Sequence, residues 1–253
     1  MVVVMTKILV FDSGSGNVPI ACAIREHLPE CELNLLSDTE FFPYGERRDQ
    51  DLIERMQLIL AEAYTLLKPD IIVLACNTAS TIALDILREQ FSCPIIGVVP
   101  AIKPAAEATK SNIIGLIATP ATIKRSYTKQ LISEFAPGCE VIRHGSTELV
   151  KMSETHAETG EYDETLLTEI LAPFISARAK GLDQLVLGCT HFALLEKPIS
   201  DILPNVAIVD SSDAIGRQVK RVLRESVDAQ NTRIDDAIMS FFITKNSKII
   251  KID

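Results

Sequence analysis

The sequence predicts an α/β fold built from two similar units, each with a parallel β-sheet. Short β-branched or aliphatic runs alternate with longer stretches of helical periodicity along the chain. Some runs, such as residues 71–75, are apolar throughout, which is typical of parallel strands covered on both faces. Strand, polar turn and helix also recur in the same order in the two halves, as in KILVFDSGSGN and NIIGLIATPAT.

In the first half, apolar residues at helical spacing predict a helix over residues 51–67, which Lys68-Pro69-Asp70 ends. The same reasoning gives strands at 7–11, 71–75 and 94–99, and further helices at 17–28 and 78–90.

In the second half, the pattern predicts strands at 112–118, near Val141, at 184–188 and at 206–210. Helices are expected from Pro120, within residues 147–180 and from Asp213. The segment 237–253 reads as two short strands around a polar turn at Lys245-Asn246.

Composition excludes several classes of protein. The net charge of −9 and the scattered basic residues argue against a nucleic-acid surface. No apolar run approaches the roughly 18 residues that span a bilayer, and residues 1–5 lack the features of a signal peptide. A cytoplasmic protein is therefore expected, whose six cysteines are thiols, and the absence of a CxxC pair disfavours zinc.

Two stretches place a cysteine directly after a predicted strand: IVLACNTAS at 72–80 and LVLGCTHFA at 185–193. In parallel sheets, chemistry gathers beyond the carboxyl ends of the strands, where Cys76 and Cys189 are expected. A single nucleophile needs one cysteine, whereas two at equivalent positions suggest one on each face of a substrate.

For Cys76, the alternative is a thiol packed in the core, but the Asn77-Thr78 that follows is polar, and Thr78 can cap the next helix. For Cys189, the alternative is a structural histidine beside a capping threonine. His191 can instead shuttle a proton or polarise the thiol, and Gly188 lets the backbone approach a ligand.

Three loops add polar groups. VFDSGSGN places Asp12 and Ser13 before a helix; it lacks the third glycine of G-x-G-x-x-G and the lysine of a P-loop, so a small carboxylate is favoured over a nucleotide. The loop with Pro43-Tyr44-Gly45 reads by composition as a plain turn. Thr119 and Thr122 can cap a helix or bind a ligand oxygen.

Together these motifs resemble the glutamate racemases of the Asp/Glu racemase superfamily, from Phe11 to about Gly216. FDSGSGN is similar to the family's D-S-G-x-G-G, GCTHFALL to G-C-T-H-F-P-L-L and DSSDA to D-S-G-D-A, while PYG and ACNTAS match directly. The departures are Asn17 and Ser212 in place of glycine and Ala193 in place of proline.

The resemblance implies cofactor-independent interconversion of L- and D-glutamate, which supplies D-glutamate for peptidoglycan. It implies that Cys76 and Cys189 are the acid/base thiols, that Asp12 and His191 assist them, and that Glu154, in the loosely matching STELVKMSE, lies near the second cysteine. It assigns substrate binding to Ser13, Pro43, Tyr44, Gly45, Asn77, Thr78, Thr119, Thr122 and Thr190.

The family fold implies one racemase domain at 1–97 plus 210–253, a second at 98–209, and an active site in the cleft between them. No pyridoxal-binding lysine, other cofactor or metal is required. Dimers are common among such enzymes, so a homodimer is one expectation. Two rivals remain at this point: an aspartate racemase of the same superfamily and a non-catalytic amino-acid-binding protein.

Overall fold

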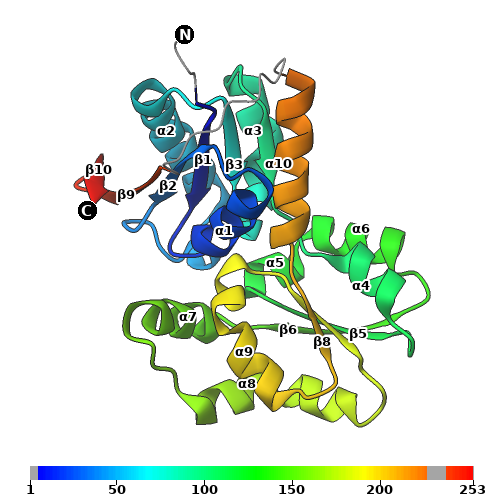
Figure 1. The fold of residues 1–253 in the computed structure, drawn as a ribbon. Helices are drawn as coiled ribbons and strands as arrows, with labels where there is room; N and C mark the ends of the chain where they lie inside the picture. The colour runs from blue at the N-terminus through cyan, green and yellow to red at the C-terminus, as the bar shows by residue number, and fades with distance from the viewer. Residues whose placement is uncertain (1–4, 227–237, 253) are drawn as a thin grey trace. The chain divides into compact units, whose positions relative to one another are not determined.

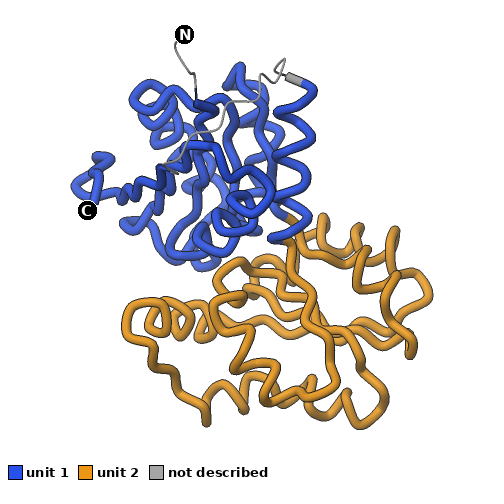
Figure 2. The backbone as a smooth tube through the Cα atoms, in the orientation of Figure 1, with its two compact units in different colours: residues 1–98, 212–253 blue, residues 99–211 orange. Residues whose placement is uncertain are grey.

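The computed structural model describes residues 5–226 and 238–252. The expectation about residues 1–5 therefore falls almost wholly outside the described residues, as do the ends of the predicted segment 237–253. The chain divides into two compact units, Met1–Val98 with Ser212–Asp253 and Val99–Ser211 (Figure 2). The boundaries expected from the family lie within two residues of these, and the assignment of the units as racemase domains stays a prediction.

Unit 1 is built on a six-stranded sheet in the order β10-β9-β2-β1-β3-β4 (Figure 1). Its strands are β1 (Lys7–Asp12), β2 (Glu32–Ser37), β3 (Ile71–Leu74), β4 (Ile95–Gly97), β9 (Met239–Lys245) and β10 (Lys248–Ile252). All neighbours pair in parallel except β9 and β10, which form an antiparallel hairpin.

Two layers of helices cover the unit 1 sheet. One face packs against α2 (Asp49–Leu67) and α3 (Asn77–Gln90), and the other against α1 (Asn17–His27) and α10 (Ser212–Ser226). The strands β1 and β3 are buried on both faces, which explains their uninterrupted apolar sequence. This packing fixes the carboxyl ends of the strands, where the predicted site residues of this unit lie.

Unit 2 is built on a four-stranded parallel sheet in the order β6-β5-β7-β8. Its strands are β5 (Ile113–Ala118), β6 (Glu140–Gly145), β7 (Gln184–Leu187) and β8 (Ala207–Val209). Its helices are α4 (Ile102–Ala108), α5 (Pro120–Lys124), α6 (Ser126–Phe135), α7 (Glu148–Thr159), α8 (Glu164–Arg178) and α9 (Glu196–Ile202).

The two sheets repeat one topology. The order β2-β1-β3-β4 in unit 1 corresponds strand by strand to β6-β5-β7-β8 in unit 2. The bonds that extend the ladders past the strand ends also correspond: Ala75 N donates to Phe11 O over 2.7 Å, and Gly188 N donates to Ile117 O over 2.7 Å. The predicted α/β class with a parallel sheet in each half is confirmed.

Some elements differ from the sequence-based expectation. The sequence did not predict β2, α4 or α9. The single helix expected from Pro120 is two helices, because Arg125 adopts an extended backbone (φ −64°, ψ 142°) that ends α5 and precedes α6. Within the described residues, no helix is both long and apolar enough to span a bilayer.

Candidate active site

Cys76 and Cys189 occupy equivalent positions of the two sheets. Each lies two residues beyond the third strand of the repeat, at the N-cap of the helix that follows: α3 for Cys76 and the 3₁₀ helix η2 (Thr190–Leu195) for Cys189. Both have extended backbones, and both side chains are mostly buried, with 7% and 8% of their surface exposed. The sequence prediction of two thiols at matching strand ends agrees with this placement.

Gly188, just before the second cysteine, serves strand packing. A Cβ there would lie 2.9 Å from the Cβ of Ala118 and 2.9 Å from the Leu116 side chain. The expectation that this glycine lets the backbone approach a ligand therefore gains no support, since side chains of β5 already fill the space.

Asp12 ends β1 and is fully buried. Its Oδ1 accepts hydrogen bonds from Gly14 N at 3.0 Å and from Ser13 Oγ at 3.3 Å, which shapes the turn into α1. Asn17, the departure from the family's glycine, holds the same turn: its Nδ2 donates to Ser37 Oγ at 3.0 Å, and that hydroxyl donates to Gly14 O at 2.8 Å. The substitution thus anchors the loop through β2.

Tyr44 begins the short 3₁₀ helix η1 (Tyr44–Glu46), between Pro43 and Gly45, so the loop is more than the plain turn that composition suggests. Its side chain is 1% exposed, and its hydroxyl donates to Asp38 at 2.8 Å. Burial, and then the charge of Asp38, raise the pKa of Tyr44 well above its usual range. The charges of Cys76 and Asp12 act in the same direction, so both groups lie within electrostatic reach of the phenol.

Asn77 and Thr78 form the first turn of α3, and both are buried. The N-cap of this helix is Cys76, so the expectation that Thr78 caps it is wrong. Asn77 Oδ1 is buried and has no hydrogen-bond partner among the described residues. A buried acceptor left open beside Cys76 is the kind of group that a bound substrate can satisfy.

In unit 2, His191 lies between Cys189 and Glu154. Its Nδ1 is 3.8 Å from Cys189 Sγ, and its Nε2 is 2.7 Å from Glu154 Oε1. The histidine is 2% exposed, and the Glu154 side chain, which comes from α7, is 22% exposed. The structure therefore brings together the three unit 2 residues to which the family resemblance assigns acid/base chemistry.

The three predicted threonines of unit 2 are all buried. Thr119 follows β5 and caps α5, since its Oγ1 accepts from Thr122 N at 3.2 Å. Thr119 Oγ1 also donates to Thr122 Oγ1 at 3.0 Å. Of the two roles left open for Thr119, capping is thus observed. Thr190 begins η2 directly after Cys189.

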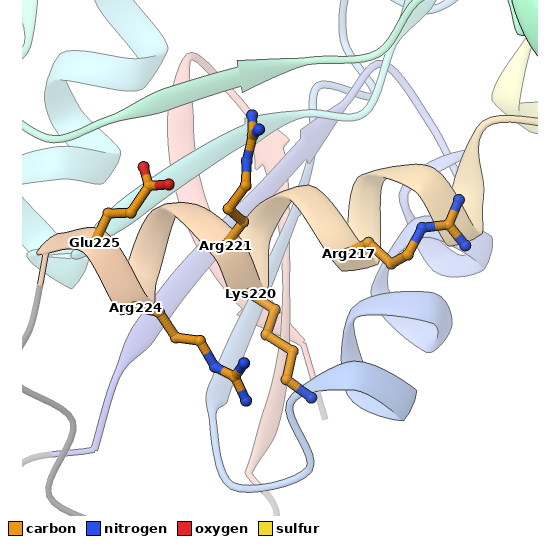
Figure 3. Close-up of a pocket in the computed structure, with 5 residues that line it drawn as sticks. All are labelled: Arg217, Lys220, Arg221, Arg224 and Glu225. Atoms are coloured by element: carbon orange, nitrogen blue, oxygen red, sulfur yellow. The ribbon is translucent and has the colours of Figure 1, made fainter.

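A surface pocket of about 300 Å³ lies elsewhere, on the C-terminal half of α10 (Figure 3). It is lined by Arg217, Lys220, Arg221, Arg224 and Glu225 and contains none of the predicted site residues. Lys220 and Arg224 point to one side of the helix and Arg221 to the other (Figure 3). It offers no thiol, imidazole or buried acceptor, so we do not assign the reaction to it.

Comparison with known proteins decides the family. The Asp/Glu/hydantoin racemase model matches residues 20–219. The chain belongs to this family. It is 44% identical over 242 residues to a glutamate racemase of Shewanella sp. (strain MR-4), covering 94% of this chain and 88% of that one.

Solved structures of family members agree. The glutamate racemase of Escherichia coli, in complex with L-glutamate and the activator UDP-MurNAc-Ala, matches with a TM-score of 0.88 at 39% identity, over 96% of this chain and 90% of that chain. The Francisella tularensis glutamate racemase, in complex with D-glutamate, matches with a TM-score of 0.77 at 28% identity, over 95% and 88%. The chain is thus an enzyme of the glutamate racemase type, as the motifs predicted.

Proposed function

We propose that this enzyme interconverts L- and D-glutamate without a cofactor and that Cys76 and Cys189 are its two acid/base groups. The observation that carries the proposal is their equivalence: each thiol stands at the same point of the same strand order, in separate units. Inversion of a stereocentre by proton exchange requires a base on one face of Cα and an acid on the other. Two repeated half-sites supply one thiol to each face.

In each turnover one cysteine starts as thiolate and the other as thiol, and the two states exchange. By family analogy, Cys76 removes the proton from D-glutamate and Cys189 removes it from L-glutamate. An unperturbed thiol has a pKa of about 8.5, so the site must favour the thiolate. The N-terminus of α3 supports a negative charge on Cys76, because Cys76 is the N-cap of this helix and lies at the positive end of the helix dipole.

The partners of the two cysteines differ. Beside Cys189, His191 is positioned to take or return a proton through Nδ1, while Glu154 holds its other nitrogen. In unit 1, Asp12 is a buried carboxylate. Its charge and that of Cys76 both raise the pKa of Tyr44, so the two groups lie near the same phenol. We assign Asp12, His191 and Glu154 to this support of the thiols.

Substrate binding is assigned to the polar groups around each thiol. The open Oδ1 of Asn77 can accept from the substrate ammonium. The remaining set comprises Ser13, Pro43, Tyr44, Gly45, Thr78, Thr119, Thr122 and Thr190. Its backbone N–H groups, and those of its hydroxyls that do not already donate within the protein, suit a carboxylate or a developing carbanion. Proline contributes only its ring and carbonyl to this set.

Glutamate is favoured over aspartate because the two structural relatives were solved with L- and D-glutamate. The test is loss of the circular dichroism signal of L-glutamate, and separately of L-aspartate, in D₂O without added cofactor. Loss with glutamate alone, together with deuterium at Cα, supports the proposal. Activity only with aspartate changes the substrate, and no exchange with either leaves an amino-acid-binding protein.

Supply of D-glutamate for peptidoglycan follows from this activity and belongs to the same proposal. The cytoplasmic location fits the cysteines: the structure describes all six, and no disulfide joins any two of them. Location and a homodimeric state stay predictions.

A further inference from the structure

A buried carboxylate lies behind the loop that carries Tyr44. Asp38 directly follows β2 and is 0% exposed. It is not among the site residues predicted from the sequence. Its Oδ2 accepts from Tyr44 OH at 2.8 Å and from Arg55 Nε at 3.0 Å. Its Oδ1 accepts from Arg55 Nη2 at 2.7 Å and from Thr244 Oγ1 at 2.7 Å. Four donors around one carboxylate fix its direction.

Arg55, on α2, contacts several residues of the loop 38–41. Beyond its two-pronged contact with Asp38, its Nη2 reaches Glu40 at 3.0 Å, and its guanidinium lies 4.7 Å from the centre of the Phe41 ring. The Arg55 side chain is only 10% exposed and that of Asp38 is 0% exposed, so the contact between these two residues is shielded from water and salt. Residues 38–41 are therefore tied to α2 by charge, hydrogen bonds and stacking.

The C-terminal hairpin holds the same loop from the other side. Thr244, on β9, is 1% exposed; its hydroxyl donates to Asp38 and accepts from Glu40 N at 3.2 Å. Thr39 Oγ1 donates to Thr244 O at 2.9 Å. The loop that leads to Pro43-Tyr44-Gly45 is thus held between α2 and β9. Because β9 is about 200 residues away in sequence, no local sequence pattern predicts this contact.

We propose that Asp38 and Arg55 are positioning residues for the reaction, which set the place of Tyr44 and its loop next to Cys76 and Asp12. The inference rests on the proposed function, in which that loop binds substrate. Neither residue touches the reacting atoms in this account. They act through Tyr44. The centre of its ring lies 6.3 Å from the centre of the Phe11 ring, and its hydroxyl donates a hydrogen bond to Asp38.

The bond to Asp38 limits the ways in which Tyr44 can contact the substrate. Its single hydroxyl proton is used by Asp38, so the hydroxyl cannot donate to a substrate carboxylate while this bond holds. Contact from this segment then comes from the ring, from the hydroxyl oxygen as acceptor, or from backbone N–H groups. The Asp38–Arg55 pair thereby decides which donors the loop presents.

The test uses R55K, with R48K as a matched control. Arg48 lies just before the same helix and makes the same two-pronged contact with a carboxylate, Asp51 (2.8 and 2.7 Å), but its side chain is 85% exposed. Lysine keeps the charge and loses the fork in both variants. T244V is a milder second variant, which removes one donor from Asp38 without changing any charge.

Three quantities are measured for each protein: kcat and KM for both enantiomers of glutamate, backbone amide exchange over residues 38–48, and the melting temperature. A displaced binding loop raises KM, whereas a merely destabilised fold lowers the active fraction, and hence kcat, at constant KM. We expect R55K to raise KM by about tenfold to 10²-fold with faster exchange confined to residues 38–48. T244V should raise KM and speed amide exchange in the loop as well, but by less. R48K should match the wild type in both.

An unchanged KM in R55K together with unchanged amide exchange in the loop overturns the inference. So does an unchanged KM with a fall in kcat that is explained by a lower melting temperature. If R55K does not fold, T244V decides by the same two readouts. Failure of the proposed function looks different: the wild type and R48K then do not racemise glutamate at all, while loop exchange still reports whether Arg55 orders residues 38–48.

Discussion

His191 Nε2 lies 2.7 Å from Glu154 Oε1, although the two residues are 37 positions apart in sequence. The contact joins α7 to η2, which pack against each other in unit 2. A carboxylate oxygen can only accept, so a neutral His191 carries its proton on Nε2 and donates it to Glu154. Nδ1 is then the acceptor, and it faces Cys189 Sγ at 3.8 Å. The pair fixes both the ring orientation and the tautomer that can receive a proton from the thiol.

E154Q tests this pair. Glutamine can keep a hydrogen bond to Nε2 but removes the charge that supports a protonated imidazole, so we expect kcat/KM to fall by about tenfold to 10²-fold. The fall must be equal in both directions, since the two enantiomers have equal free energy and the ratio of the two kcat/KM values is therefore fixed at one. E158Q, one turn later on α7 and exposed, is the control. Wild-type kinetics in E154Q would remove Glu154 from the site.

G216A tests the packing of α1 against α10, which lie side by side (Figure 1). A Cβ at Gly216 would lie 2.7 Å from the carbonyl oxygen of Ala23 and 2.5 Å from the His27 ring. Alanine normally favours a helix by about 1 kcal/mol over glycine, but this overlap with backbone should outweigh that gain and give a net loss of about 1–3 kcal/mol. G138A is the control, because its added Cβ meets nothing within 4 Å. Equal or higher stability of G216A in thermal unfolding contradicts the close packing.

D183N tests a hydrogen-bonded turn in unit 2 through its pH dependence. Burial raises the pKa of Asp183, but hydrogen bonds from Thr109 Oγ1 (2.6 Å), Lys110 N (2.7 Å) and Ser111 N (3.2 Å) outweigh it, so the net pKa is lowered. A lowered folded pKa adds stability above the unfolded value of about 3.9, and this stability is lost as pH falls through the folded pKa.

We therefore expect D183N to cost about 1–3 kcal/mol in urea unfolding at pH 7. The difference from the wild type should shrink as the pH is lowered below about 4, where the aspartate becomes protonated. A difference that stays the same at both pH values would show that the charge of Asp183 contributes nothing.

The sequence was sufficient for the fold class and for the placement of the two cysteines after matching strands, because both depend on local signals. Apolar runs mark β1, β3, β5 and β7, and a polar residue follows each of them closely. The strand β2 was missed because Asn34 interrupts its apolar run; the side chain is buried and bonds to Glu32 at 2.9 Å. Without β2, Asp38 could not be recognised as a second aspartate at a strand end, although Asp12 was.

Contacts between distant segments were out of reach for a physical reason. Periodicity reports which face of an element is buried, and it does not report which side chains from other elements meet there. Arg55 reads as an ordinary polar position of a helix, and Thr244 as one residue of a terminal strand. Only the parallel pairing of β2 with β9 brings Thr244 to Asp38. Glu154 was placed by the family motif rather than by any pattern in its own helix.

The most direct test of the central claim is the rate of glutamate racemisation in C76S and C189S, measured by circular dichroism in both directions. C22S is the control, because Cys22 is an exposed thiol on α1 outside the proposed site. The two-thiol account predicts that each of the first two variants loses activity by about 10³-fold or more while keeping the wild-type melting temperature, and that C22S retains full activity. Full activity in either C76S or C189S would contradict it.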